Sequence, residues 1–445
     1  MIEFKPVLLW SDILLFVLLG LTLSGAYASW RSEPMRRQWQ RLGRNAAGMA
    51  AAMVLSFFIV VGVLDSLHYR ARLPAQGDTA PVYGVEVLSV LDALLMPLKT
   101  NSEKTYSAPL AMRLFAKEAV EGEVGRDFPR LRYGGAHLGD DEENHGWDVA
   151  VQVLGGLGAS MAIWLALAWR LRGGGPGRAA VRWSLLLLCL AAGPTIALAA
   201  HYHVLGTDKV GQDVLYLALK SIRTGLLIGT LTTLVTLPLA VLLGILAGYA
   251  GGWLDDAIQY VYTTLNSIPG VLLIAAAVLM MQVVIDTHPD WFSTAAERAD
   301  ARLLALCFIL GMTSWTGLAR LLRGETLKLR ELDYVQAAQA FGVSRRAIML
   351  RHILPNVSHI VLIALVMDFS SLVLAEAVLS YVGIGVDPTT ISFGTMINAA
   401  RMELAREPMV WWSLVAAFSF MFALVLAANL FADAVRDAFD PRAAQ

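Results

Sequence analysis

Apolar segments that recur along the chain restrict its fold more than any other feature of its sequence. Nine of these segments reach about 20 residues, the length of α-helix that crosses the hydrocarbon core of a bilayer. Of the 445 residues, 57% are hydrophobic and 16% are charged, whereas soluble domains contain about 25% charged residues. The sequence therefore predicts an all-α, polytopic membrane protein.

Polar loops separate the predicted membrane spans, whose ends can shift by about 2–4 residues. The spans are Leu8–Ser29, Ala46–Leu67, Val149–Trp169, Trp183–His201, Thr224–Tyr249, Ile258–Val284, Leu303–Leu322, Ile360–Val382 and Met409–Phe431. The first span has neither a basic start nor an evident cleavage site, so it is interpreted as a retained helix rather than a signal peptide. The two cysteines, Cys189 and Cys307, lie in apolar segments and are interpreted as small buried side chains rather than a disulfide.

Basic residues concentrate in three loops, and short loops rich in lysine and arginine face the cytoplasm. They are Arg31, Arg36, Arg37, Arg41 and Arg44 after the first span, Arg170, Arg172, Arg178 and Arg182 after the third, and Arg323, Lys328, Arg330, Arg345, Arg346 and Arg351 after the seventh. Alternation through nine spans places these three loops on the same side of the membrane. The sequence thus predicts a periplasmic N-terminus, a cytoplasmic C-terminus and a periplasmic region at 68–148 that contains some packed structure.

A polar, basic segment lies between the seventh and eighth spans and reads YVQAAQAFGVSRRAIMLRHILPN over residues 334–356. Within it, Gly342 has no Cβ and permits the positive φ that ends many helices. Ser344 is the predicted N-cap of a second helix, Arg345–Ile353, which Pro355 is expected to stop. Two short helices joined by a turn suit a loop that transmits force, and the alternative is a basic loop bound to lipid headgroups.

Four motifs occur in order in the second half of the chain. They are His203-Val204-Leu205-Gly206-Thr207-Asp208 with Gly211-Gln212-Asp213-Val214, the loop with Gln336-Ala337-Ala338, Gly342 and Leu354-Pro355, the segment Ala375–Gly385, and Arg436–Arg442. On these motifs the sequence from His203 onward resembles the C-type permease subunit of dipeptide, oligopeptide and nickel ABC importers. The resemblance covers a little over half of the chain, and the motifs are specific together although each alone is weak.

The resemblance implies a transporter subunit that carries no ATPase of its own. Such a subunit forms a translocation path with a homologous permease, and a periplasmic substrate-binding protein delivers the substrate. Two ABC ATPase subunits, which bind ATP and Mg, dock from the cytoplasm of a cell with an inner membrane. The expected substrate is a di- or oligopeptide, with a peptide-like compound or nickel as the alternative.

In this family a loop called the EAA loop, which corresponds to residues 323–356, docks into a cleft on the ATPase subunit. The resemblance assigns this coupling role to Gln336, Ala337, Ala338, Gly342, Arg345, Leu354 and Pro355. Gln336 stands where the family often has Glu, and Gln212 where it often has Arg. No charge-based role is therefore implied at either position.

The resemblance also implies a core of six spans with about three additional N-terminal helices. The predicted regions are an added helix with a basic segment at 1–45, the first core span at 46–67, the periplasmic region at 68–148, an inserted hairpin at 149–202 and the rest of the core at 203–445. A two-span insertion leaves the orientation of all later spans unchanged, which agrees with the distribution of basic loops.

Two acids, Asp368 and Glu376, lie within the eighth predicted span, where an unpaired carboxylate costs several kcal/mol. They are about 80° apart around a helix axis and about 12 Å apart along it, so they share a broad face without touching. Both are candidates for the translocation path, and the alternative is a structural hydrogen bond to a neighbouring helix.

Two further acids, Asp208 and Asp213, precede the fifth predicted span. The resemblance suggests that they belong to a short helical element that shapes the periplasmic gate. The alternative is ordinary capping, in which Thr207 or Asp208 accepts the free N–H groups of the helix that follows.

Motifs for other functions are missing from the sequence. It contains no G-x-x-x-x-G-K-[ST] loop for ATP and no arrangement typical of a catalytic centre, so no enzyme activity and no cofactor are predicted for this chain. His201 and His203 are two residues apart and have no third ligand nearby, which argues against a metal site. No nucleic-acid partner is predicted.

An ion-coupled secondary transporter and a membrane scaffold are the alternative functions. The first needs internal repeats with broken helices, and Pro238 and Pro269 could break the fifth and sixth spans. The two halves of the chain nevertheless do not match each other. The additional N-terminal helices are the only argument for a scaffold.

Overall fold

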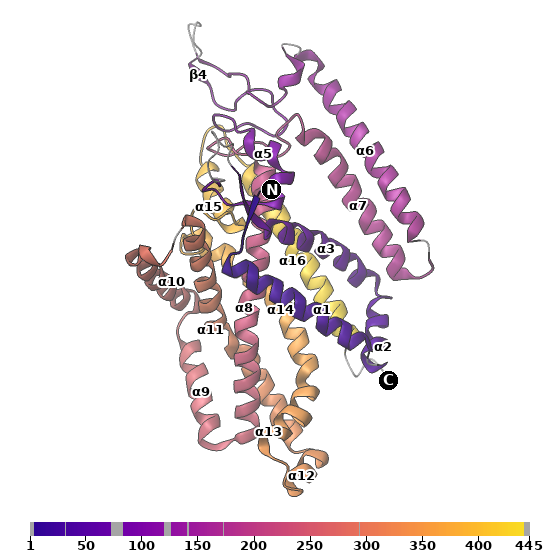
Figure 1. The fold of residues 1–445 in the computed structure, drawn as a ribbon, viewed down its shortest axis with the longest axis vertical. Helices are drawn as coiled ribbons and strands as arrows, with labels where there is room; N and C mark the ends of the chain where they lie inside the picture. The colour runs from indigo at the N-terminus through magenta and orange to yellow at the C-terminus, as the bar shows by residue number, and fades with distance from the viewer. Residues whose placement is uncertain are drawn as a thin grey trace, which may run out of the picture. The chain divides into compact units, whose positions relative to one another are not determined.

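The computed structural model describes residues 4–31, 33–72, 83–119, 126–139, 142–171, 173–292 and 294–439 (Figure 1). Within these residues, nine helices are long and apolar enough to cross a membrane. They are α1 (Trp10–Arg31), α3 (Ala46–Asp65), α6 (His145–Arg170), α7 (Pro176–Ala199), α8 (Val214–Ala250), α10 (Gly270–Thr287), α11 (Ala295–Arg330), the continuous helical run Arg345–Val382 and α16 (Trp412–Phe439). The predicted all-α, polytopic class is confirmed.

The chain divides into two compact units. The first comprises residues 1–12, 40–226 and 388–427, and the second comprises residues 13–39, 227–387 and 428–445. Helices α1, α8 and α16 each begin in the first unit and end in the second.

Two features of the sequence analysis lie outside the described residues: Arg172 and the last three residues of the fourth motif, 440–442.

The first unit contains a small antiparallel sheet and several short helices besides its long ones. Strands β1 (Phe4–Val7), β2 (His68–Ala71) and β3 (Leu88–Ser89) lie in the order β1-β2-β3. The short elements are α2 (Glu33–Leu42), which ends in this unit, α4 (Val90–Leu94), α5 (Met96–Thr100), β4 (Glu118–Ala119), β5 (Arg126–Asp127), the 3-10 turns Ala136–Leu138 and Glu142–Asn144, and α15 (Phe393–Glu403). The described parts of the region 68–148 therefore contain packed structure, as expected.

Close backbone contacts build the α6–α7 pair, which Figure 1 shows as a hairpin of two adjacent helices. A Cβ on Gly156 would come within 2.6 Å of the Gly193 carbonyl oxygen. Such small residues let helix backbones approach closely in a membrane, where association depends on packing rather than on hydrophobic force. Helix α7 packs in turn against α3, and Gly177 lies directly against the carbonyl oxygen of Gly43.

Glycines also bring α8 and α11 together in the second unit. A Cβ on Gly244 would lie 2.7 Å from the Ala319 carbonyl oxygen. One helical turn later, a Cβ on Gly248 would lie 2.7 Å from the Arg323 carbonyl oxygen. The Arg323 guanidinium also donates two hydrogen bonds to Asp255, at 2.6 and 2.7 Å, and so joins the following helix, α9 (Gly252–Ser267), to α11.

The sixth predicted span, Ile258–Val284, is wrong as a single helix. The chain forms α9 and α10 there instead, with a break at Ile268 and Pro269. Ile268 has an extended backbone (φ −93°, ψ 132°), because a proline ring disfavours helical backbone at the residue before it. Of these two helices, only α10 is long and apolar enough to cross a membrane.

Several spans extend beyond their predicted ends. Helix α8 starts at Val214 rather than at Thr224, and its additional turns carry the charged side chain of Lys220. This charge is tolerated because Lys220 Nζ lies 2.6 Å from Asp65 Oδ1. Hydropathy alone cannot predict such an extension, since the partner that compensates the charge comes from a distant part of the chain.

Candidate functional site

The EAA-type loop, residues 323–356, folds as two short helices joined by a turn. After α11 it comprises α12 (Asp333–Ala340), α13 (Arg345–Ile348), a π-helical turn (Met349–Ile353) and the start of α14 (Leu354–Val382). Gly342 has φ 76° and donates its N–H to the Gln339 oxygen at 3.0 Å, while the Val343 N–H bonds the Ala338 oxygen at 3.1 Å. These two bonds close α12 with a Schellman motif, which confirms the predicted glycine turn.

The second helix of the loop begins as predicted but does not stop where expected. Ser344 Oγ accepts a hydrogen bond from the Ala347 N–H at 3.4 Å, which confirms the N-cap. The expectation that Pro355 ends this helix is wrong, because the chain stays helical from Arg345 to Val382. Pro355 lies in the first turn of α14, where its missing N–H is tolerated, and the π-helical turn before it changes the hydrogen-bond register.

The inner face of the loop is fixed to the second unit by apolar packing. From the loop and the adjoining start of α14, four side chains join the core around Leu322 of α11 with 1% exposure or less: Val335, Ile348, Ile353 and Val357. Side chains packed at the density of a protein interior transmit displacement rather than absorb it. A force on the loop would therefore reach α11 directly.

The outer face of the loop combines exposed apolar and basic side chains. Of the predicted coupling residues, Ala338 and Leu354 are half-buried, and those exposed are Gln336, Ala337, Gly342, Arg345 and Pro355. Phe341 is 88% exposed immediately before the glycine turn, and Leu350 is 64% exposed. Exposed apolar groups rimmed by polar ones are typical of protein-binding surfaces. The sequence analysis missed Phe341, although a large aromatic residue beside a turn glycine was the available signal.

Glu376 lies inside the protein rather than on a wetted surface. Its exposed fraction is 1%, and Ser380 Oγ donates a hydrogen bond to Glu376 Oε1 at 2.7 Å. The Val386 N–H also reaches Ser380 Oγ at 3.4 Å, and Gly385 packs directly against this serine. The third motif thus folds tightly around Ser380, and this geometry supports the structural interpretation of Glu376 over the path interpretation.

Asp368 has a different environment, about two turns earlier in α14. Its side chain is half-buried, and its carboxylate has no hydrogen-bond partner among the residues that the structure describes. The next two residues face neighbouring helices: Phe369 packs against Gly229 of α8, and Ser370 donates a hydrogen bond to Asn429 of α16 at 2.6 Å. The two acids are not brought together, and a path role remains a prediction for Asp368.

Asp213 caps the N-terminus of α8. Its Oδ1 accepts hydrogen bonds from the backbone N–H groups of Leu215 at 2.8 Å and Tyr216 at 3.2 Å. The expectation that Thr207 or Asp208 caps this helix is wrong, because α8 begins only after Asp213. A cap must lie immediately before the first helical turn, whereas Thr207 and Asp208 lie seven and six residues before Val214.

The short helical element expected around Asp208 is also wrong, since the described residues 201–213 form turns. Gly206 and Gly211 have φ values of 73° and 76°, which a right-handed helix cannot contain. Asp208 shapes the second of these turns, because its Oδ1 accepts the N–H groups of Val210 and Gln212, both at 2.9 Å.

A buried histidine joins this loop to the preceding region of the first unit. His203 Nδ1 lies 2.8 Å from Asp213 Oδ2, and its Nε2 lies 3.5 Å from Glu103 Oε1. Glu103 also accepts the backbone N–H groups of Arg132 and Tyr133, both at 2.8 Å. Burial opposes a charge on His203, but the two carboxylates outweigh it and raise its pKa to about 9.

The sequence analysis explained His203 by its motif and missed Glu103, which lies 100 positions earlier. Burial raises the pKa of Glu103, yet hydrogen bonds from His203 and three backbone N–H groups leave this pKa below its usual value. The other histidine of the pair, His201, packs against His137 instead, with ring centroids 4.4 Å apart and the rings tilted by 46°. Among the described residues no three His, Cys, Asp or Glu side chains are grouped to hold a metal ion.

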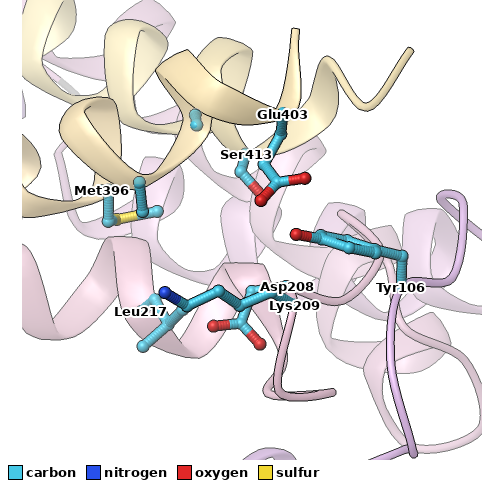
Figure 2. Close-up of a pocket in the computed structure, with 9 residues that line it drawn as sticks. Tyr106, Asp208, Lys209, Leu217, Met396, Glu403 and Ser413 are labelled. Carbon is cyan, nitrogen blue, oxygen red and sulfur yellow. The ribbon is translucent and has the colours of Figure 1, made fainter. Parts of the chain in front are cut away.

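Asp208 also faces a small cavity of about 50 Å³ in the first unit, shown in Figure 2. Its wall includes Tyr106, Lys209 and Glu403, with apolar contributions from Met396 of α15. Burial raises the pKa of the Asp208 carboxyl, while its hydrogen bonds to backbone N–H groups oppose that shift. The cavity brings two acids and one amine together, which suits a polar gate but leaves that role a prediction.

Residues 240–445 match the model of a protein family described as "Binding-protein-dependent transport system inner membrane component". The chain is 31% identical over 239 residues to the oligopeptide transport system permease protein OppC of Mycobacterium tuberculosis, covering 54% of this chain and 76% of the relative. The chain belongs to this family. The EAA-type loop, Asp368 and Glu376 all lie within the residues that the family model matches.

Other relatives agree with this family assignment. The dipeptide transport system permease protein DppC of Lactococcus lactis is 31% identical over 243 residues, covering 55% of this chain and 65% of the relative. The glutathione transport system permease protein GsiD of Pectobacterium atrosepticum is 32% identical over 242 residues, covering 54% and 73%. This binding-protein-dependent inner membrane component is accordingly a multi-pass permease subunit of an ABC importer.

We expect the thermal stability of this inner membrane component to fall as pH rises from about 6.5 to 9. The pKa of His203 in the folded protein, about 9, exceeds the value of about 6.5 for an unfolded chain. Its stabilising effect, on the order of 1–3 kcal/mol, is therefore complete below pH 6.5 and lost as pH passes the folded pKa. Melting curves recorded across this pH range measure the effect.

The matched variants for this test are His203→Gln and His359→Gln. The first should be less stable at neutral pH and should lose most of the pH dependence, whereas the second should keep the wild-type slope. An unchanged slope in His203→Gln would show that another group titrates.

Proposed function

We propose that this chain is the permease subunit of an ATP-driven importer for di- and oligopeptides. Its relatives support this substrate class, since those named above are permeases for oligopeptides, dipeptides and glutathione. A peptide-like compound or nickel is the alternative substrate. Membership of a family of binding-protein-dependent transport components favours ATP-driven transport over the ion-coupled and scaffold alternatives.

The observation that carries this proposal is the construction of the EAA-type loop. Its inner side chains are fully buried against α11, whereas Phe341 projects from its outer face with 88% exposure. A loop that only binds lipid headgroups does not need a rigid base or a glycine-capped turn. A loop that receives force from a partner needs both.

The proposed partners follow from this role. Two ABC ATPase subunits bind ATP and Mg and dock on the EAA-type loop, with Phe341 inserted in a groove rimmed by acidic groups that face Arg345 and Arg346. A homologous permease completes the translocation path, and a periplasmic substrate-binding protein delivers the peptide. When the ATPases close on ATP, they displace the loop and the core below it, which opens the path by rigid-body alternating access.

The two intramembrane acids receive different roles in this proposal. Asp368, half-buried and without a partner among the described residues, lines the path. Glu376 instead holds the tight turn around Ser380. Asp208 and Asp213 act at the gate, Asp208 through the cavity of Figure 2 and Asp213 by capping α8.

Gly342→Val should reduce peptide-stimulated ATPase activity of the assembled transporter several-fold without preventing assembly. The new side chain meets open space, but its φ of 76° is strained for a β-branched residue by about 1–2 kcal/mol. The strain would unwind the turn and displace Phe341. ATPase activity with a dipeptide mixture, and separately with nickel, measures coupling and substrate class together.

Two controls separate backbone strain from added volume. Gly342→Asn should retain more coupling, because Asn tolerates this backbone conformation. Gly317→Val places the same side chain in open space on α11, outside the EAA-type loop, and it should leave coupling unchanged. Full coupling in Gly342→Val would count against the docking role, and stimulation by nickel alone would replace the peptide assignment.

Asp368→Asn should lower peptide uptake while leaving the melting temperature unchanged, because a carboxylate without a partner contributes to the path rather than to the fold.

Glu376→Gln should transport peptide normally, since the amide oxygen still accepts the Ser380 hydrogen bond. Glu376→Leu should lose about 1–3 kcal/mol of stability by leaving that hydroxyl unpaired. Reduced uptake in Glu376→Gln at unchanged stability would return Glu376 to the path.

Single-cysteine labelling tests the proposed orientation. Cysteines at Gly174 and Ser344 should react only with membrane-permeant reagents, whereas one at Gly139 should react with impermeant reagents added to the periplasmic side. This pattern follows from a cytoplasmic C-terminus and a periplasmic N-terminus. Labelling of position 174 from outside would contradict the inserted hairpin.

A further inference from the structure

Five arginines lie on two turns that meet at one end of the first unit. They are Arg41, Arg44, Arg170, Arg178 and Arg182, here called the arginine face. Arg182 is half-buried and the other four are exposed, and none forms an ion pair among the residues that the structure describes. The chain has no Asp or Glu between residues 41 and 45 or between residues 170 and 182.

Two separate segments build the arginine face. The turn between α2 and α3 is closed by bonds from Arg44 N to Arg41 O (3.0 Å) and from Asn45 N to Leu42 O (3.0 Å). Asn45 then caps α3. The turn of the α6–α7 hairpin supplies the other arginines.

The two segments meet at a backbone contact that excludes any side chain. Gly177 at the start of α7 lies against the carbonyl oxygen of Gly43, where a Cβ would overlap it. Arg44 and Arg178 each follow one of these glycines directly, so their Cα atoms are neighbours of the contact. The side chains of Arg44 and Arg178 therefore start on the two sides of one contact, and that of Arg178 extends over Gly173 in the hairpin turn.

Exposed tryptophans beside this face indicate that it lies at the depth of the lipid headgroups. Trp169 and Trp183 flank the hairpin turn and are 64% and 65% exposed. Trp164 donates its indole N–H to the Arg182 carbonyl oxygen at 2.9 Å and so ties the two helices below the turn. Tryptophan concentrates at the depth of lipid headgroups, so the arginines beside these indoles lie at the same depth.

We propose that the arginine face binds the phosphate of an anionic phospholipid, with Arg44 and Arg178 as the central pair. A guanidinium matches the geometry of phosphate oxygens and donates two parallel hydrogen bonds to them. The exposed apolar surfaces of α6 and α7 continue from the face and suit the acyl chains of the same lipid. The occupant is therefore a lipid rather than a soluble anion or an acidic protein segment.

The lipid would act as a clamp between the hairpin and the rest of its unit. The phosphate joins α7 to the turn before α3 at the point where only a glycine contact holds them. Neutralising the arginines also removes the mutual repulsion of like charges held close together. Anionic lipid should therefore stabilise the protein as well as bind to it.

The test uses the full chain in its transporter complex, reconstituted in nanodiscs of phosphatidylcholine with increasing phosphatidylglycerol. We expect the melting temperature to rise with phosphatidylglycerol, and native mass spectrometry to detect retained phosphatidylglycerol. In Arg44→Gln with Arg178→Gln, apparent affinity should fall by about fivefold for each arginine removed. Arg44→Lys with Arg178→Lys keeps both charges and should lie between this variant and the wild type.

The matched control is Arg126→Gln with Arg132→Gln, which removes two exposed arginines from the predicted periplasmic region. This control should bind phosphatidylglycerol as the wild type does. Equal lipid binding in the Arg44/Arg178 glutamine variant, or an equal loss in the control, would overturn the site. Equal stabilisation by inorganic phosphate in detergent would show a free-anion site and overturn the lipid assignment.

Discussion

The close backbone contact between α8 and α11 is the interaction on which the second unit depends. Gly244 and Gly248 allow α8 to approach the carbonyl oxygens of α11, and no residue with a Cβ fits there. Lipid supplies no hydrophobic force between helices, so their association depends on close packing of this kind. Leu322 of α11 lies beside this contact and forms the floor on which the EAA-type loop is packed.

Because the loop is packed on Leu322, a displacement of the loop also moves the helices joined to it. The helical run from Arg345 to Val382 is continuous, and at 1.5 Å per residue it spans roughly 55 Å. The loop lies at one end of this run, and the turn around Ser380, with Glu376, lies at the other. A displacement of the loop is thus delivered along one rigid element to a tightly folded turn, with Asp368 on the way.

Charged side chains organise the first unit in a different manner. Lys220 lies 2.6 Å from Asp65, and His203 lies between Asp213 and Glu103. A buried charge is costly unless it is paired. The first unit therefore folds stably only when these acidic and basic partners lie next to each other. The arginine face differs, because its proposed partner is the phosphate of a membrane lipid rather than a carboxylate of the chain.

The sequence by itself determined what depends on neighbouring residues. Apolar runs fixed the membrane class, Gly342 fixed the turn of the EAA-type loop, and Ser344 fixed the cap that follows it. Tertiary structure decided whatever needs a partner from elsewhere in the chain. The pairing of Lys220 in α8 depends on Asp65, the charge of His203 depends on Glu103, and the exposure of Phe341 depends on which loop residues the core leaves uncovered. Local backbone preferences are encoded within a few residues, whereas desolvation and charge pairing are set only when distant segments meet.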